Sequence, residues 1–136
     1  MRTLFSRLWI LGIPLLALVS ACAGLGPANI RPLYNVEDVP FSNGPLETLS
    51  EAAGDIRRAA TFLGWTVEEK GPNEILATNR KGKHAAVVTI RFDKKKFSIN
   101  YRNSVLLDYD GAKIHKLYNL WVADLERTIQ AETSLN

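Results

Sequence analysis

The sequence predicts an α+β domain of two layers, in which two helices cover one face of a four-stranded antiparallel meander. Apolar residues recur at spacings of three and four over residues 46–63 and again over residues 112–131, as in amphipathic helices. Between these segments lie four short runs that alternate or are rich in β-branched residues, separated by turn residues. Each helix has a single apolar stripe, so both helices are expected on the same face of the sheet, in the order α-β-β-β-β-α.

The first helix is predicted over residues 46–63. Pro45 suits the first helical position, and Gly64 suits the left-handed residue that follows the last turn. The apolar stripe comprises Leu46, Leu49, Ala53, Ile56, Ala60 and Leu63.

Four strands are predicted over residues 65–69, 74–80, 84–92 and 96–102, and short polar turns connect them. Successive residues of a strand point to opposite faces of the sheet, so the face of each side chain follows from counting. The residues expected under the helices are Val67, Ile75, Ala77, Ala86, Val88, Ile90, Phe92, Phe97, Ile99 and Tyr101.

The second helix is predicted over residues 112–131, with Asp110 as its N-cap and a frayed tail at residues 132–136. Its buried stripe is expected to comprise Ile114, Leu117, Tyr118, Trp121, Leu125 and Ile129.

The other face of the sheet is predicted to be open, polar and basic. Residues 70–116 carry a formal charge of +7, whereas residues 37–69 carry −5 and residues 117–136 carry −2. One interpretation is internal complementarity between acidic helices and a basic sheet. The other is a binding surface for anions, since guanidinium groups donate pairs of hydrogen bonds to phosphate and carboxylate. The candidate binding residues are Arg80, Arg91, Lys96 and Arg102.

The N-terminal segment is typical of a cleavable secretion signal. Arg2 and Arg7 precede an apolar run, and this run is shorter than the roughly 20 residues that a spanning helix requires. We therefore predict a signal peptide over residues 1–21 and a tether rich in Gly and Pro over residues 22–45. A single domain then follows over residues 46–131. The apolar segment around Leu33 either docks on this domain as an extended piece or belongs to the tether, and the sequence does not decide between the two.

Val19-Ser20-Ala21-Cys22 resembles the lipobox of bacterial lipoproteins, and Cys22 is the only cysteine in the chain. The resemblance implies that Cys22 is acylated, becomes the mature N-terminus and attaches the protein to a membrane. In enterobacterial lipoproteins an Asp after the cysteine favours retention in the inner membrane, so Ala23 implies the periplasmic side of the outer membrane. The alternative is an ordinary secretion signal with an incidental cysteine.

A second resemblance lies near the C-terminus, over residues 101–122. The segment contains Tyr109-Asp-Gly-Ala-Lys-Ile-His115-Lys-Leu-Tyr118 followed by Trp121-Val122. It is similar to the C-terminal part of a group of small proteobacterial lipoproteins, which also have a lipobox, a short tether and one domain. The resemblance implies an anchored domain and transfers no catalytic residue.

Polar residues gather around the predicted start of the second helix. They form either a loop that satisfies its own backbone or a small binding pocket. A calcium loop that begins at Asp108 would place Ala112, Ile114 and Asn119 at ligand positions, so no metal site is predicted. The candidate pocket residues are Asn103, Ser104, Asp108, Asp110, His115 and Lys116.

Three functional hypotheses follow. The first is a lipid-anchored interaction module or accessory subunit of a cell-envelope assembly. The second is a protein that binds an anionic envelope ligand, such as a phospholipid or lipopolysaccharide phosphate, through the open sheet face. The third is an enzyme with a site in the loop of residues 103–119. We predict neither a cofactor nor catalysis, and the expected compartment argues against nucleic acid as a partner despite the basic sheet.

Overall fold

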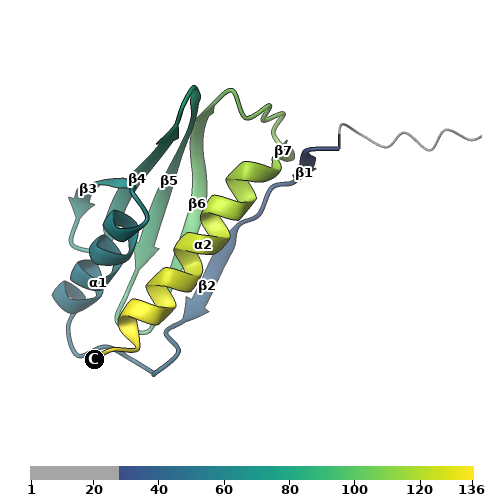
Figure 1. Ribbon diagram of the computed structural model, residues 1–136. Helices are drawn as coiled ribbons and strands as arrows, with labels where there is room; N and C mark the ends of the chain where they lie inside the picture. The colour runs from purple at the N-terminus through teal and green to yellow at the C-terminus, as the bar shows by residue number, and fades with distance from the viewer. Residues whose placement is uncertain (1–27) are drawn as a thin grey trace, which may run out of the picture.

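The computed structural model describes residues 28–136, so the predicted signal peptide and Cys22 lie outside the described residues. A five-stranded antiparallel sheet with the order β2-β6-β5-β4-β3 is covered on one face by two helices (Figure 1), and β1 and β7 form a separate two-stranded sheet. The α+β class is confirmed, but the four-stranded layout is wrong because β1, β2 and β7 were not predicted. The elements are β1 Ile30–Pro32, β2 Val36–Pro40, α1 Leu49–Phe62, β3 Thr66–Gly71, β4 Glu74–Lys81, β5 His84–Phe92, β6 Lys96–Val105, β7 Lys113–His115 and α2 Lys116–Thr133.

The fifth strand comes from the segment predicted as a tether. β2 pairs with β6, with Val36 opposite Ile99, and Val36 is only 2% exposed. Phe41, just after the strand, is 3% exposed and stacks on Phe97. The predicted tether of residues 22–45 is therefore too long, since the chain belongs to the folded domain from Ile30 onward.

The first helix begins later than predicted. Thr48 is its N-cap, and the Thr48 hydroxyl accepts a hydrogen bond from the backbone N–H of Glu51 at 3.0 Å. Pro45 therefore precedes the helix rather than occupying its first position. The predicted left-handed cap is confirmed, because Gly64 has a φ of +86° and the next residue, Trp65, donates its N–H to the carbonyl of Ala60 at 3.0 Å.

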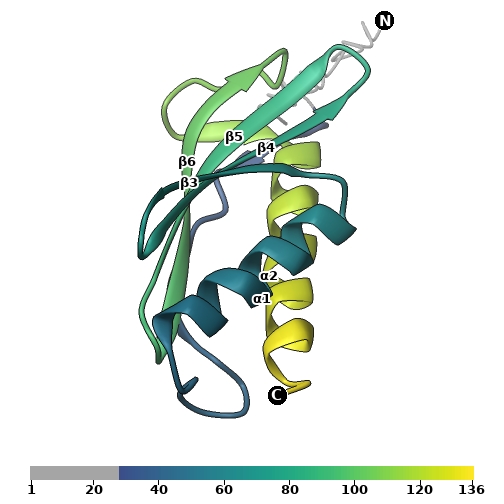
Figure 2. The same ribbon diagram turned by 90° about the vertical axis from the view of Figure 1, so that its left-hand side faces the viewer.

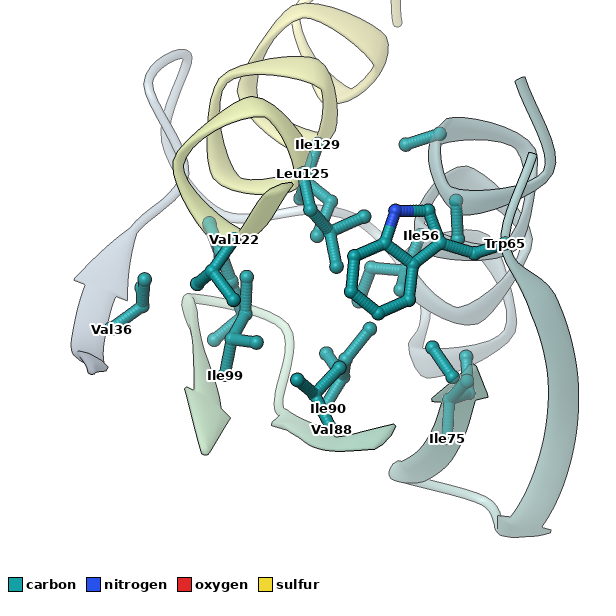
Figure 3. Packing of buried hydrophobic residues seen from close by; sticks show 14 of the residues in the cluster. Val36, Ile56, Trp65, Ile75, Val88, Ile90, Ile99, Val122, Leu125 and Ile129 are labelled. Carbon is teal, nitrogen blue, oxygen red and sulfur yellow. The ribbon is translucent and has the colours of Figure 1, made fainter. Parts of the chain in front are cut away.

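The core lies between the sheet and the two helices (Figure 2), and Trp65 lies near its centre. Figure 3 shows the indole ring among Ile56 of α1, Leu125 of α2 and Ile90 of β5. The residues predicted under the helices are all in or against this core, with Val67 and Tyr101 only partly buried.

The second helix differs from the prediction at its start and in its stripe. Lys113–His115 pairs with Ile30–Pro32, so the helix begins at Lys116, and the N-cap is His115 instead of Asp110. Val122, which the predicted stripe omitted, is fully buried, whereas Trp121 is only partly buried. The tail is also tied down, because the Asn136 side chain donates to the buried carboxylate of Asp55.

Candidate functional site

The four cations predicted on the open face do not form one cluster. Arg80 lies opposite Ala85 at one end of β4, whereas Arg91 lies opposite Glu74 at the other end. Arg80 comes six positions after Glu74, which is about 20 Å along a strand that rises about 3.3 Å per residue. Counting by two gives the face of each arginine correctly, but it does not show that Arg80 and Arg91 lie at opposite ends of the β4–β5 pair.

Arg91 and Lys96 have carboxylate partners at the end of the sheet near the β5–β6 turn. The Arg91 Nε atom lies 3.2 Å from Glu74 Oε2, and the Lys96 Nζ atom lies 3.1 Å from Asp38 Oδ1. Arg91, Lys96 and Asp38 line a depression of about 200 Å³. All four side chains are at least one-third exposed, so the pairs are worth little for stability, and they reduce the charge available for an external anion.

Arg80 and Arg102 have no ion-pair partner among residues 28–136. Arg102 lies at a shift in the register of β5 and β6, because Val87 is opposite Asn103 while Val88 is opposite Tyr101. The extra residue reverses the alternation beyond it. A simple count therefore gives the wrong face for the residues after Arg102.

Several polar side chains at the end of β6 and in the loop after it bind the local backbone and one another. The Asp110 carboxylate accepts hydrogen bonds from the N–H groups of Ala112 and Lys113, at 2.9 and 2.7 Å. Asn103 accepts from the N–H of Ser104, and the Ser104 hydroxyl lies 2.9 Å from the Tyr101 hydroxyl. The full set predicted here was Asn103, Ser104, Asp108, Asp110, His115 and Lys116. The side chains of Asn103, Ser104, Asp110 and His115 make local hydrogen bonds, whereas those of Asp108 and Lys116 make none among residues 28–136.

Aromatic rings gather beside this loop, which the sequence analysis did not anticipate. The Tyr101 and Tyr109 rings are 4.0 Å apart, and the Tyr118 ring lies edge-on to Tyr101 at 5.6 Å. Tyr118 is fully buried, and its hydroxyl has no hydrogen-bond partner among the described residues. Burial strongly raises the pKa of Tyr118, so its phenol stays neutral.

Two histidines make hydrogen bonds next to the loop after β6. The His84 Nδ1 atom lies 2.8 Å from the carbonyl oxygen of Leu106, so Nδ1 must carry the hydrogen in this contact. His115 has the opposite role, because its Nδ1 accepts the N–H of Leu117 at 3.2 Å. The rings stack at 6.2 Å. The His115 side chain therefore caps α2, and only its backbone N–H bonds the loop, at the Leu107 carbonyl. The role of His84 gave no sequence signal.

The described part of the chain, residues 28–136, has neither a metal-binding cluster nor a membrane-spanning helix. Within this part of the chain, no group of three or more His, Cys, Asp or Glu side chains is placed to hold a metal ion. No helix in the same part is long and apolar enough to cross a membrane.

Comparisons of the chain with protein-family models, curated proteins and solved structures find no match. Function is therefore inferred from the sequence and geometry of this chain alone.

The Asp110 carboxylate gives the loop a predicted dependence on pH. The N–H groups of Lys113 and Ala112 lower the pKa of Asp110 below its ordinary value of 3.8. Its contribution to stability is therefore present above that value and is lost as the pH falls through the folded-state pKa. In Asp110→Asn, we expect the thermal midpoint to fall less than in the wild type between about pH 5 and pH 3.

Asp108→Asn is the matched control, because it removes a charge from the same loop. The Asp108 carboxylate makes none of the side-chain hydrogen bonds found in residues 28–136. This control should lose stability on acidification as the wild type does. An equally steep loss in Asp110→Asn would contradict the assigned role of the Asp110 carboxylate.

Proposed function

We propose that the protein is a lipid-anchored interaction module of a bacterial cell envelope, attached through acylated Cys22. Its partner in this proposal is another envelope protein, for which it serves as an accessory subunit. The signal-like N-terminus, the lipobox resemblance and the single small domain support the assignment.

The observation that carries the proposal is the short length of chain between Cys22 and the folded domain. Seven residues separate Cys22 from Ile30, the first residue of β1. A fully extended chain spans at most about 3.6 Å per residue, so β1 begins within about 29 Å of the acylated residue. The domain would thus work at the membrane surface and not at the end of a long tether.

An apolar groove supports contact with a protein partner. It has a volume of about 470 Å³ and is lined by Leu33, Tyr34 and Leu120, among others. Leu120 is 56% exposed. The Asn119 side chain holds one side of the groove in place, because it donates a hydrogen bond to the Pro32 carbonyl and accepts one from the Tyr34 N–H. Exposed apolar surface of this kind is typical of interaction sites.

A second function, the binding of an anionic envelope ligand, is favoured by the cations without partners. Arg80 and Arg102 have no ion-pair partner among the described residues, whereas Arg91 and Lys96 are paired with carboxylates. Arg80 and Arg102 therefore carry this proposal more than the other two do. We propose no enzymatic role for the loop of residues 103–119, because the side chains of Asn103, Ser104 and Asp110 are engaged with the local backbone and with neighbouring side chains.

The proposed anchor is tested by Cys22→Ser. We expect this variant to lose incorporation of labelled palmitate and to leave the detergent phase on phase separation. Ala23→Ser is the matched control, since it changes the neighbouring residue but keeps the thiol, and it should partition as the wild type does. Unchanged partitioning of Cys22→Ser would exclude the lipid anchor. With the anchor intact, co-purification from detergent-solubilised envelopes would identify the protein partner.

A further inference from the structure

We propose that one end of the domain rests on the surface of an anionic lipid bilayer. This end comprises the end of β4, the β4–β5 turn, the end of β6 with the loop after it, and the adjoining parts of β1, β7 and α2. The proposal rests on the proposed lipid anchor and goes beyond it by giving the anchored domain an orientation. We call this region the basic end, and its cations are Arg31, Arg80, Lys81, Lys83, Arg102, Lys113 and Lys116.

Contacts between distant segments hold the basic end together. Lys81 is opposite His84 in the β4–β5 hairpin, and His84 donates to the carbonyl of Leu106 in the loop after β6. The His84 ring in turn stacks on His115, the last residue of β7. Figures 1 and 2 both show these elements at one end of the molecule, with the C-terminus at the other.

The cations of the basic end form no ion pairs within the described part of the chain. The seven ion pairs formed among residues 28–136 include none of its seven cations. The acidic residues of its segments are Asp108 and Asp110, and Asp110 already accepts two backbone N–H groups. Like charges held close together repel, so their grouping here does not help the domain to fold. An anionic surface would offset this repulsion.

Apolar side chains are exposed among these cations. Val105 is 47% exposed, Leu106 is 58% exposed and Tyr109 is 37% exposed. Lysine and arginine beside exposed apolar groups form the combination that binds the interface of a bilayer, where the cations meet phosphates and the apolar groups enter the acyl boundary.

The backbone holds Leu106 in this exposed position. Leu106 has a φ of +54°, in the left-handed region that a branched side chain rarely adopts. The next residue, Leu107, is 1% exposed, and its carbonyl accepts the N–H of His115 at 2.8 Å. The two hydrogen bonds to this loop thus keep one leucine inside the core and its neighbour outside. Backbone strain that the surroundings maintain is a frequent property of functional segments.

The described chain also enters at the basic end. The Lys116 N–H donates to the carbonyl of Asn29 at 2.7 Å, which fixes the start of the described chain beside the first turn of α2. Because Cys22 is only seven residues from β1, an acyl chain on Cys22 and the basic end can engage the same bilayer. The anchor then raises the effective concentration of lipid around these side chains, so that weak contacts suffice.

The test measures the depth of single labelled positions in the full, acylated protein. With Cys22 acylated, Leu106→Cys provides one free thiol at the basic end, and Leu135→Cys provides a matched thiol at the opposite end, where Leu135 is 79% exposed. Each variant is labelled with an environment-sensitive fluorophore and reconstituted in phosphatidylcholine vesicles, with or without phosphatidylglycerol, that contain a lipid-borne quencher. In vesicles that contain phosphatidylglycerol, we expect a blue shift and quenching at position 106 but not at position 135. Both signals should be lost at high salt.

A charge variant separates the cations from a general effect of the anchor. Lys81→Gln combined with Lys83→Gln should reduce quenching at position 106, whereas Lys94→Gln combined with Lys95→Gln, in the turn between β5 and β6, should leave it unchanged. Circular dichroism checks that each variant is folded, and Val105→Cys replaces Leu106→Cys if the latter unfolds.

Equal quenching at positions 106 and 135 would overturn the proposal, and so would quenching that is the same without phosphatidylglycerol. In that case the basic end is free for a protein partner. Failure of the anchor gives a different result, because a protein that lacks acyl chains by mass spectrometry would not remain with the vesicles at all.

Discussion

Trp65→Ala is expected to lower the free energy of unfolding by about 3–5 kcal/mol, the usual cost of removing a large buried aromatic side chain. Trp65 is 3% exposed and lies where α1, α2 and the sheet meet (Figure 3). Alanine would leave a cavity that cannot easily close, since Ile56 and Ile90 are held by a helix and a central strand. A small domain has only about 5–15 kcal/mol of stability in total, so a large fraction is at risk.

Urea unfolding followed by circular dichroism measures this loss. Trp121→Ala is the matched control, because it removes the same side chain from a partly buried position on α2. The control should cost less than Trp65→Ala. The opposite ranking would show that Trp121, which the sequence analysis placed in the buried stripe, is the more important of the two residues.

Removing the segment that was predicted as a tether is expected to abolish cooperative folding. A protein that begins at residue 46, the predicted domain boundary, lacks β1 and β2 and with them the buried side chains of Val36 and Phe41. Full burial of such a side chain is worth about 1.5–3 kcal/mol, and loss of β2 also leaves the hydrogen-bonding edge of β6 open. The summed loss approaches the total stability of a small domain.

A protein that begins at residue 28 is the matched comparison, because it also lacks the N-terminal segment but retains β1 and β2. It should show a single thermal transition by circular dichroism, and the version that begins at residue 46 should not. If both versions unfold in a single transition with the same midpoint, β1 and β2 contribute nothing to the stability of the fold.

The parts of the fold that were predicted correctly depend on local patterns. Strands β3 to β6 alternate between turns that are recognisable in the sequence, and α1 has a clear apolar stripe with Gly64 at its end. Neighbouring strands of a hairpin are close in sequence, so their pairing follows from the turns alone.

The parts that were missed depend on contacts between distant residues. β2 is only five residues long and pairs Val36 with Ile99, and β1 is three residues long and pairs with β7. Pro32 and Pro40 were counted as breakers, yet proline is compatible with the ends and edges of sheets. The start of α2 moved for the same reason, because pairing with β1 holds Lys113–His115 as a strand.

The candidate site was predicted only in part. The sequence indicated a basic middle segment and correctly separated the faces of β4 and β5, but it could not reveal which cations have carboxylate partners. The partner of Lys96 is Asp38, in a segment that was expected to lie outside the domain. The basic end was missed because its cations come from β1, β4, the β4–β5 turn, β6, β7 and the start of α2, which only the folded chain brings together.

The two edge strands also bear on self-association. A protein held in a membrane, as proposed here, meets its own copies in two dimensions and therefore at high local density. β2 is interrupted where Asp38 adopts a φ of +49°, and β3 carries three consecutive charged residues, Glu68, Glu69 and Lys70. Irregular backbone and exposed charge both hinder the addition of a further strand. Neighbouring domains should consequently stay separate even when crowded, without a covering partner on either edge of the sheet.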